Sequence, residues 1–385
     1  MHEDREAVQL HAPAGATRLV VAVSGRALAV SARRGGHPVI VLDYFADRDT
    51  AANARRAVSV VSPRGLRFDR RALLAAAREL APGADLVYGS GFEGRPSLLR
   101  DLAAGRRLLG NAPDVIRAVK DPDRLGTLLG RLGIPHPETR RTPPPSRAGW
   151  LLKRAGGAGG THVRPAAGHV PGRGDYFQRH LPGRSYSALF LADGRRSLVL
   201  GFNRQWTRTL SPAMPFLFGG AVGGVRLAPR LARTVTGAIG ELVRSTGLVG
   251  INGIDFLVNG RDWSLLEVNP RPTATMELYD PDYPGGLFAL HLAACDGRLP
   301  TRARAPRACR ALAVVHAPEP GAAADLAFPA WCRDIPREET LFGAGDPVCT
   351  VHSTAADPET AVTRVEGRRR RIEQLIARNG SGVPA

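Results

Sequence analysis

The most constraining feature of this chain is an alternation of apolar runs with an amphipathic stretch across residues 18–43. The apolar run RLVVAV is followed by Gly25, by the Ala-rich stretch RALAVSARRGG and by a second apolar run that ends in Asp43. Two apolar strands joined by a helix lie parallel in one sheet whose faces are both covered. The segment therefore predicts a βαβ unit.

The same alternation continues through the next segments of the chain. VSVV (58–61), a helix predicted near 70–81 and DLVYGS (85–90) extend it. We therefore expect an open parallel α/β domain over residues 1–112. Within it, GSGFEG (89–94) has the glycine spacing of a dinucleotide-binding turn, but it comes late in the domain. Its position favours a substrate-side loop at the carboxyl end of a strand.

Two further regions follow. After two helical segments (112–133) and a Pro-rich connection (135–146), short runs predict a small antiparallel lobe: WLLK (150–153), THV (161–163), YFQRHL (176–181), SYSALFLA (185–192) and SLVLGF (197–202). A helix over 228–246, a hairpin GINGIDFLV…WSLLEVN and a helix over 285–295 come next. We expect a two-lobed domain at 113–300, with a lid lobe at about 145–182, and a small α+β region at 301–385.

Composition restricts the partners only weakly. The net charge of +18 would favour nucleic acid, but of 53 basic residues only Lys120 and Lys153 are lysines, in a chain rich in Ala, Gly and Pro. This usage is typical of GC-rich coding, so we expect no nucleic-acid partner. No apolar run spans a membrane, the first residues lack a secretory pattern, and the four cysteines have neither metal-site nor disulfide spacing. We therefore expect a cytoplasmic protein.

The two lysines that remain are candidates for binding a nucleotide. An ammonium group is a compact point charge that fits between phosphate oxygens, whereas the planar guanidinium imposes a wider, bidentate geometry. Lys153 is followed by a loop that a phosphate lid requires, with the residues Gly156, Gly157, Gly159, Gly160 and Thr161. Glycine lets backbone N–H groups approach phosphate oxygens, and the alternative is a plain flexible hairpin loop. The lysine precedes the glycines, so this is no Walker motif.

A second cluster lies in the hairpin that ends in LLEVNPRPT. Glu267 and Asn269 alternate on one face of a strand and offer two oxygen ligands at its end. Such a sparse oxygen set suits Mg²⁺ bound together with nucleotide phosphates. Asp255, on the partner strand, is the third candidate ligand. A turn of three or five residues would put it on the Glu267 face, and a turn of two or four residues would put it on the other face.

Together these segments resemble the ATP-grasp superfamily over about residues 18–296. The combination of SGRALAVSARRGG, LDYFADRD, YGSGFEG, LLGN, LLEVNPRPTATMEL and PAWCRDIP is similar to a branch of predicted ATP-dependent carboligases distantly related to biotin carboxylase. The resemblance implies an N-terminal α/β domain, a two-lobed ATP-grasp domain and a small C-terminal region.

The resemblance also implies roles for particular residues. Lys120 and Lys153 would contact phosphates under the closed glycine loop, and Arg271 would stabilise an acyl phosphate. Asp255, Glu267 and Asn269 would hold Mg²⁺. The adenine would be lined by Gln178, Arg179, His180 and Leu181, which would also supply backbone hydrogen bonds. Candidate substrate residues are Phe202, Asn203, Arg204, Gln205 and Trp206, with FGGAVGG (218–224) as a floor.

The activity that the resemblance implies is an ATP- and Mg²⁺-dependent ligation of a small carboxylate to an amine or thiol, through an acyl phosphate. Cofactor biosynthesis and a homodimer are further expectations. The alternatives are a biotin-carboxylase-like carboxylating enzyme and a non-catalytic ATP-binding sensor. The absence of a biotinyl-carrier segment from these residues favours the ligase.

Overall fold

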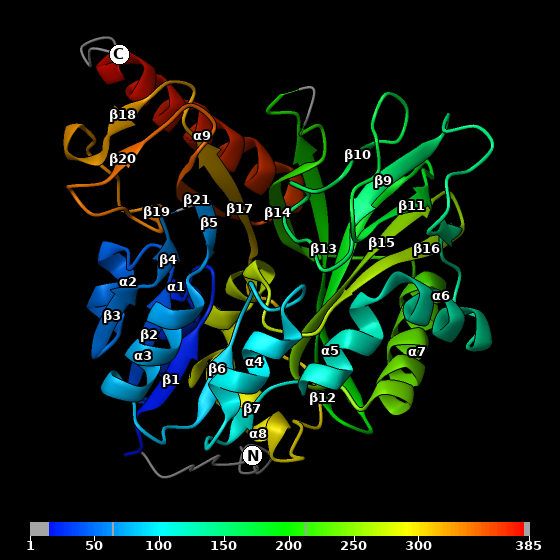
Figure 1. Cartoon of the computed structure of the whole chain (residues 1–385), viewed down its shortest axis with the longest axis horizontal. Helices are drawn as coiled ribbons and strands as arrows, with labels where there is room; N and C mark the ends of the chain where they lie inside the picture. Colours follow the sequence, from blue (N-terminus) through cyan, green and yellow to red (C-terminus); the bar gives the residue numbers. More distant parts are fainter. Residues whose placement is uncertain (1–14, 64, 212–213, 381–385) are drawn as a thin grey trace.

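A five-stranded parallel sheet forms the N-terminal part of the computed structural model, which describes residues 15–63, 65–211 and 214–380 (Figure 1). Its order is β3-β2-β1-β6-β7. The strands are β1 (Arg18–Val21), β2 (Val39–Asp43), β3 (Arg56–Ser59), β6 (Leu86–Tyr88) and β7 (Leu108–Leu109), and the helices between them are α1 (Arg26–Arg34), α2 (Arg48–Asn53), α3 (Arg70–Leu80) and α4 (Pro96–Ala103). A short hairpin of β4 (Val61–Ser62) and β5 (Gly65–Phe68) lies beside them.

The strand order of this sheet reverses between β1 and β6. The chain builds the sheet outward from β1 to β3 and then returns to the other side of β1 with β6. In open α/β sheets, ligands bind outside the carboxyl ends of the strands at such a switch point. Two loops lie there, at 22–25 and 89–94, so the expectation of a loop at the carboxyl end of a strand for GSGFEG is confirmed.

A small four-stranded sheet follows α5 (Pro113–Lys120) and α6 (Pro122–Arg131). Its order is β10-β9-β11-β8, with β8 (Thr139–Arg140), β9 (Trp150–Arg154), β10 (Arg164–Pro165) and β11 (Asp175–Arg179). The strand predicted at THV (161–163) is wrong. The backbone turns there, with Val163 N–H donating to Gly160 O at 3.1 Å, and pairing with β9 begins only at Arg164.

An eight-stranded antiparallel sheet is the centre of the molecule. Its order is β16-β15-β12-β13-β14-β17-β21-β19, with β12 (Arg184–Asp193), β13 (Ser197–Arg208), β14 (Leu217–Val225), β15 (Val249–Asn259), β16 (Asp262–Asn269), β17 (Cys309–His316), β19 (Cys332–Arg333) and β21 (Pro347–Ala355). The runs at 185–192 and 197–202 belong to this sheet and not to the small lobe, because β12 pairs with β15 along its whole length. The C-terminal strands extend the same sheet through β14 and β17.

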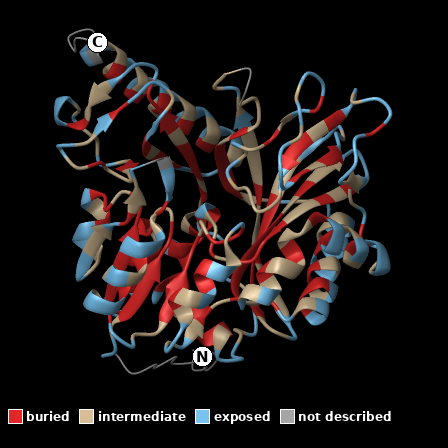
Figure 2. Ribbon diagram, viewed as in Figure 1, coloured by how far each residue is buried: buried red, intermediate tan, exposed pale blue. Residues whose placement is uncertain are grey.

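Helices cover the large sheet and join it to the parallel one. The remaining elements are α7 (Pro229–Thr246), α8 (Gly286–Cys295), α9 (Pro358–Gly380), the 3-10 turns η1 (Ala274–Leu278), η2 (Asp280–Asp282) and η3 (Ala323–Asp325), and a hairpin of β18 (Gly321–Ala322) and β20 (Leu341–Phe342). One apolar core includes Leu28 of α1, Phe288 of α8 and Ile251 of β15. Figure 2 shows the buried residues running from the parallel strands into the large sheet, so a shared core fixes the two parts against each other.

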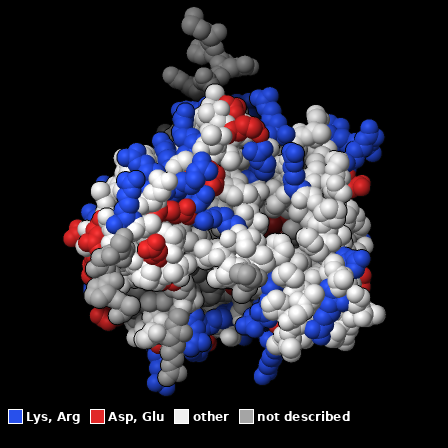
Figure 3. Space-filling view, turned by 90° about the horizontal axis from the view of Figure 1, so that it is seen from above, with Lys and Arg blue, Asp and Glu red and all other residues white. Residues whose placement is uncertain are grey.

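Two surface properties bear on the expected partners. In the described ranges, no helix combines the length and apolar character needed to cross a bilayer. Viewed from above, Lys and Arg side chains are spread over the face in Figure 3, with Asp and Glu side chains among them. The first 14 residues of the predicted first domain and the last five of the C-terminal region, 381–385, lie outside the described residues.

Candidate nucleotide and metal site

Lys120 and Lys153 reach the end of strand β16 from two different elements. Lys120 is the last residue of α5, and its Nζ lies 3.1 Å from Glu267 Oε2 and 3.5 Å from Asn269 Oδ1. Lys153 is on β9, and its Nζ donates to Gln178 Oε1 at 3.1 Å. Its charge also interacts with Glu267. The structure thus brings both ammonium groups to one carboxylate and amide strand end.

Asp255 joins this set through a β-bulge. A two-residue turn connects β15 and β16, since Asn259 pairs with Asp262, and such a turn alone would place Asp255 on the face opposite Glu267. One extra residue in β16 shifts the register, so that Asp255 pairs directly with Glu267. Asn269 Nδ2 then donates to Asp255 Oδ2 at 2.8 Å. The expectation that a two-residue turn removes Asp255 from this face is therefore wrong.

The electrostatics of the strand end favour a bound cation. Burial and the neighbouring Glu267 carboxylate raise the pKa of Asp255. Burial would also raise the pKa of Glu267, but the charges of Lys120 and Lys153 hold it below its usual range. The Glu267 side chain keeps 30% of its surface exposed, so its carboxylate is accessible. A divalent cation would relieve the repulsion between the two carboxylates.

His162 lies beside the same charges and was not predicted as a site residue. Its Nδ1 is buried and has no hydrogen-bond partner among the described residues. Burial lowers the pKa of His162 to about 4, and its ring interacts electrostatically with Glu267, Lys153 and Lys120. A neutral imidazole with an unpaired nitrogen next to two ammonium groups can bond to a phosphate group. Only its place in the lid segment, directly after Thr161, could have suggested this role.

The residues fit Mg²⁺ held together with a nucleotide. Asp255, Glu267 and Asn269 offer the oxygen donors that Mg²⁺ prefers, and the unpaired His162 Nδ1 is a polar atom with which a phosphate group could bond. In the part of the chain that the structure describes, no three His, Cys, Asp or Glu side chains are grouped to hold a metal ion by themselves. A metal at this strand end would therefore need phosphate oxygens as additional ligands.

The glycine loop after Lys153 packs against two neighbouring segments. A Cβ added at Gly156 would lie 2.3 Å from Gly94 Cα, and one added at Gly160 would lie 1.9 Å from Phe216 O. At Gly157 an added Cβ would overlap the His162 ring at 2.2 Å. The loop is therefore seated between the N-terminal domain and the β13–β14 hairpin.

Two positions in this loop have no such packing contact. Gly159 has φ +67° and open space where a Cβ would lie, while its carbonyl accepts from Phe218 N–H at 3.0 Å. Thr161 is exposed, and its Oγ1 donates to Ala158 O at 3.3 Å. These two residues face outward from the seated part of the loop.

The segment after β11 only partly matches its expected role. The N–H groups of Arg179 and His180 donate to the carbonyls of Glu138 and Gly149 at 2.8 and 2.9 Å. These two N–H groups are used within the protein, so they are not available as donors to adenine, and the adenine role of Arg179 and His180 stays a prediction for their other groups. Arg179 instead stacks over the Trp150 ring, 5.5 Å from its centroid.

Gln178 and Leu181 remain predicted adenine contacts. Gln178 is buried beside Lys153 and lines a small pocket together with Tyr176, Leu265 and Leu266. Leu181 is half-buried at the start of the connection to β12.

Arg271 is tied to the loop at the switch point of the parallel sheet. Its Nε donates to Glu93 Oε1, and both side chains are almost fully buried. Its charge also interacts with Glu267 and Asp255. Glu93, which was not predicted as a site residue, accepts from Gly91 N–H at 2.7 Å and lies at the carboxyl end of β6. The N-terminal domain thus positions the arginine that follows the predicted metal strand.

The candidate substrate residues on β13 divide between two faces. Gln205 faces the site, because its Nε2 donates to Asp255 Oδ1 at 3.1 Å. Asn203 is fully buried and bonds to Ser187 and Tyr279, so it lines no open pocket. Arg204 and Trp206 point the other way and donate to Glu359 and Glu366 of α9. Because side chains alternate along a strand, Arg204 and Trp206 do not line the pocket. The Phe202 carbonyl accepts a hydrogen bond from Tyr279 Oη at 2.8 Å.

The second Gly-rich stretch, 218–224, is not a floor of the site. A Cβ added at Gly220 would lie 2.4 Å from the Trp206 ring, and one added at Gly223 would lie 2.9 Å from Leu278 Cβ and 3.2 Å from Tyr279 Cζ. These glycines make room for large side chains between β14 and its neighbours. The expectation of a second ligand-binding glycine segment is wrong.

Comparisons with known proteins agree with this architecture. Residues 124–275 match the model of an ATP-grasp domain. An uncharacterised protein of Methanocaldococcus jannaschii is 23% identical over 357 residues, which cover 86% of this chain and 87% of that protein.

Two solved structures have the same fold across most of the chain. One is biotin carboxylase from Campylobacter jejuni in complex with β,γ-ATP, with a TM-score of 0.71, 14% identity and coverage of 90% of this chain and 89% of that one. The other is N5-carboxyaminoimidazole ribonucleotide synthetase from Thermotoga maritima, with a TM-score of 0.65, 14% identity and coverage of 92% and 98%. The expected α/β architecture and the predicted ATP-grasp enzyme class are confirmed. Residues 124–275 thus match an ATP-grasp domain, and the chain has the fold of biotin carboxylase.

Proposed function

We propose that the protein joins a small carboxylate to an amine, or to a thiol, in an ATP- and Mg²⁺-dependent reaction that passes through an acyl phosphate. One observation carries the proposal: Lys120 Nζ lies 3.1 Å from Glu267 Oε2, and the charge of Lys153 acts on the same carboxylate. Two ammonium groups and a carboxylate pair at one strand end can bind a single magnesium triphosphate. This arrangement supports phosphoryl transfer.

Each residue has a defined task in this proposal. Lys120 and Lys153 place positive charge on the phosphates, so charge that develops on the transferred γ-phosphoryl group is offset in a buried site. Asp255, Glu267 and Asn269 would hold Mg²⁺, which supplies Lewis-acid polarisation of the phosphates when bound. Gln178, which is buried beside Lys153, and Leu181 would contact the adenine end.

The glycine loop and Arg271 would protect and position the activated acid. Gly156 packs against Gly94, so the loop closes over the site from the small sheet to the N-terminal domain and excludes water. Arg271, fixed by Glu93, presents a guanidinium that can stabilise the acyl phosphate. The amine nitrogen then attacks the acyl carbon. A C–N bond forms, the C–O bond to phosphate breaks, and the nitrogen loses its proton to solvent.

A carboxylating reaction is the second candidate, because the fold is shared with biotin carboxylase and with a carboxyaminoimidazole synthetase. In that case the acid would be bicarbonate, and the same site residues would activate it. Cofactor biosynthesis and a homodimer stay predictions.

The test is ADP formation across a panel of acids and amines. We expect ADP release that needs Mg²⁺, one acid and one amine together, with transfer of one ¹⁸O from a labelled carboxylate into phosphate. ADP formation that requires bicarbonate would support the carboxylating reaction instead. Nucleotide binding with no turnover across the panel, or phosphorylation of an acceptor without ligation, would contradict the ligase.

Replacement of Lys153 by Met or of Glu267 by Gln tests the site itself. We expect each variant to lose about 10²-fold or more in turnover, because Lys153→Met removes a positive charge from the phosphates and Glu267→Gln removes the charge of a proposed Mg²⁺ ligand. Lys153→Met should also weaken ATP binding in calorimetry. The matched control is Asp262→Asn, an exposed acid at the other end of the same strand β16. Wild-type turnover by Lys153→Met would refute the assignment.

A further inference from the structure

An open cavity lies at the edge of the parallel sheet where strand β2 begins. Its volume is about 450 Å³, and its walls include the C-terminal end of α1, the start of β2 and the segment that joins α2 to β3. This volume is within the range of small-molecule sites in proteins. The loops 22–25 and 89–94 lie at the carboxyl ends of the parallel strands, so the cavity is at the opposite edge of this sheet.

The charged side chains that line this cavity are basic. Arg33, at the end of α1, and Arg55, directly before β3, line it from two different segments. His37 also lines it, and no Asp or Glu is among the lining residues in the described part of the chain. An anion in the cavity would therefore be attracted by two guanidinium groups and would meet no lining carboxylate.

Both of these arginines bond to neutral acceptors. Arg33 donates to Ala52 O, and Arg55 NH1 donates to Thr17 Oγ1 at 2.8 Å. Neither forms an ion pair with a carboxylate of the described residues, whereas Nε of the neighbouring Arg34 lies 3.6 Å from Asp280 Oδ2. A guanidinium has five N–H donors, so most donors of the two lining arginines remain available to a ligand.

A third guanidinium is buried in contact with His37. Arg18 is only 6% exposed, and its NH1 lies 3.3 Å from Ala16 O and 3.3 Å from His37 Nδ1. Its Nε is buried and has no hydrogen-bond partner in the described ranges. A buried guanidinium is costly unless an anion offsets its charge, and both acceptors of Arg18 are neutral. This arrangement points to an anion on the other side of His37.

The contact with Arg18 also sets the proton position on His37. Arginine can only donate, so His37 Nδ1 accepts and the ring proton is on Nε2. Burial and the charge of Arg18 lower the pKa of His37, so the ring is neutral at pH 7. The ring packs against Phe288 of α8, with 5.8 Å between the ring centroids. His37 is therefore a neutral N–H donor held in the cavity wall.

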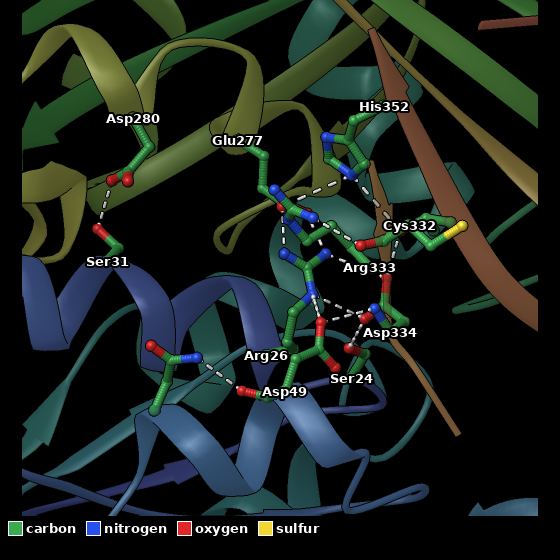
Figure 4. A network of polar contacts seen from close by, with 12 residues as sticks. Ser24, Arg26, Ser31, Asp49, Glu277, Asp280, Cys332, Arg333, Asp334 and His352 are labelled. Carbon is green, nitrogen blue, oxygen red and sulfur yellow. Dashed lines mark hydrogen bonds and ion pairs between the residues drawn. The ribbon is translucent and has the colours of Figure 1, made fainter. Parts of the chain in front are cut away.

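The helix that forms part of this wall is anchored on other segments (Figure 4). In α1, Arg26 donates to Glu277, and Ser31 Oγ donates to Asp280 Oδ1. Directly after the helix, a Cβ added at Gly35 would lie 2.5 Å from the backbone oxygen of the residue before α8. The cavity wall is thus fixed before any ligand binds, which lowers the entropy cost of binding.

We propose that this cavity binds a phosphate group of a small organic molecule. Arg33 and Arg55 reach it from different segments, and the charge of Arg18 adds to theirs. A phosphate group offers oxygens in several directions to such donors, whereas a carboxylate offers two oxygens in one plane. The volume exceeds that of a phosphate group and leaves room for the organic part. The inference does not rest on the proposed ligase, because these residues have no task in that reaction.

Pyrophosphate binding to the full chain tests this proposal. Pyrophosphate also fits the nucleotide site, so the experiment is done in the Lys153→Met chain and read by hydrogen exchange, which locates the bound anion. We expect slower exchange of backbone amides within 33–39 and 52–56, at constant ionic strength. Citrate, which carries only carboxylates, should bind at least about tenfold more weakly than pyrophosphate.

Substitutions of exposed arginines test the cavity residues. Arg33→Gln and Arg55→Gln should each weaken pyrophosphate binding at least about tenfold, because each removes a charge-assisted hydrogen-bond donor. The matched control is Arg34→Gln, since Arg34 is paired with Asp280 and does not line the cavity. It should bind pyrophosphate as the parent chain does.

The outcomes separate this inference from the proposed function. No protection of 33–39 or 52–56 at millimolar pyrophosphate would overturn it, as would equal affinities of Arg33→Gln, Arg55→Gln and Arg34→Gln. Citrate binding as tight as that of pyrophosphate would overturn the assignment to phosphate. Pyrophosphate binding in the cavity of a chain that forms no ADP with any acid and amine would overturn only the ligase.

Discussion

The two Gly-rich segments of this protein contain four glycines each but have different structural roles. In the loop after Lys153, Gly156 and Gly160 have positive φ and touch backbone atoms of two other segments, at Gly94 and Phe216. In β14, Gly220 and Gly223 do not have positive φ, and their missing Cβ atoms leave room for the side chains of Trp206 and Tyr279. A run of glycines in a sequence therefore indicates only that the fold leaves no room for Cβ atoms at these positions. It does not show whether a ligand, a backbone or a side chain excludes them.

The largest expected effect in this comparison is that of Gly160→Ala on activity. Gly160 has φ +78°, and the new Cβ would lie 1.9 Å from Phe216 O. The loop must therefore move away from the β13–β14 hairpin. Because a displacement of about 1 Å in a positioning element costs about 10²-fold, we expect ADP formation to fall by that factor. The melting temperature should fall much less, since the loop contributes little core. Activity within twofold of wild type would show that this contact is not needed for closure.

Gly220→Ala should act on stability instead. Its Cβ would overlap the Trp206 ring at 2.4 Å and Leu312 O at 2.5 Å within the large sheet. Overpacking of this kind costs about 1–3 kcal/mol, which urea unfolding would measure. Adding Trp206→Leu should recover part of the loss, and ATP affinity of the folded variant should match wild type. A weakened ATP affinity with unchanged stability would mean that β14 is a ligand floor after all.

The smallest effect is expected from Gly159→Ala. A Cβ would enter open space there, so only the left-handed φ of +67° resists it, at a cost of about 1–2 kcal/mol borne by a surface loop. We expect a loss of a few-fold in turnover. Gly159→Asn should lose less, because Asn tolerates this conformation better than Ala. Equal losses for the two variants would point to a steric role at this position.

Most elements of the fold follow from local patterns. The helices predicted near 70–81 and over 228–246 and 285–295 form as α3, α7 and α8 within one residue or so, because their apolar spacing and the Gly or Pro at their ends act locally. The assignment of strands to sheets was less predictable. Runs 185–192 and 197–202 look like further strands of the small antiparallel lobe, yet β12 pairs with β15, more than fifty residues away in sequence.

Residue type alone singled out most members of the candidate nucleotide site but not all of their positions. Lys120, Lys153 and Glu267 stand out because a lone carboxylate in an apolar strand and two lysines in an arginine-rich chain are unusual. The side of the hairpin on which Asp255 lies depends on a bulge that leaves no mark in the sequence. His162 and Glu93 lie in segments that the sequence marks, the lid segment and the loop 89–94, but their contacts with the site depend on distant segments that the fold brings together.

The sequence by itself determined which chemical groups are available and which short segments become helices and strands, since propensity, periodicity and charge are properties of neighbouring residues. Tertiary structure alone decided which of those groups share a site. Arg26, Glu277 and Asp334 come from three regions of the chain, and they meet because the shared core packs the parallel sheet, the segment after β16 and the C-terminal strands together. These contacts depend on packing and strand register between residues that are far apart in sequence, and no local sequence pattern predicts them.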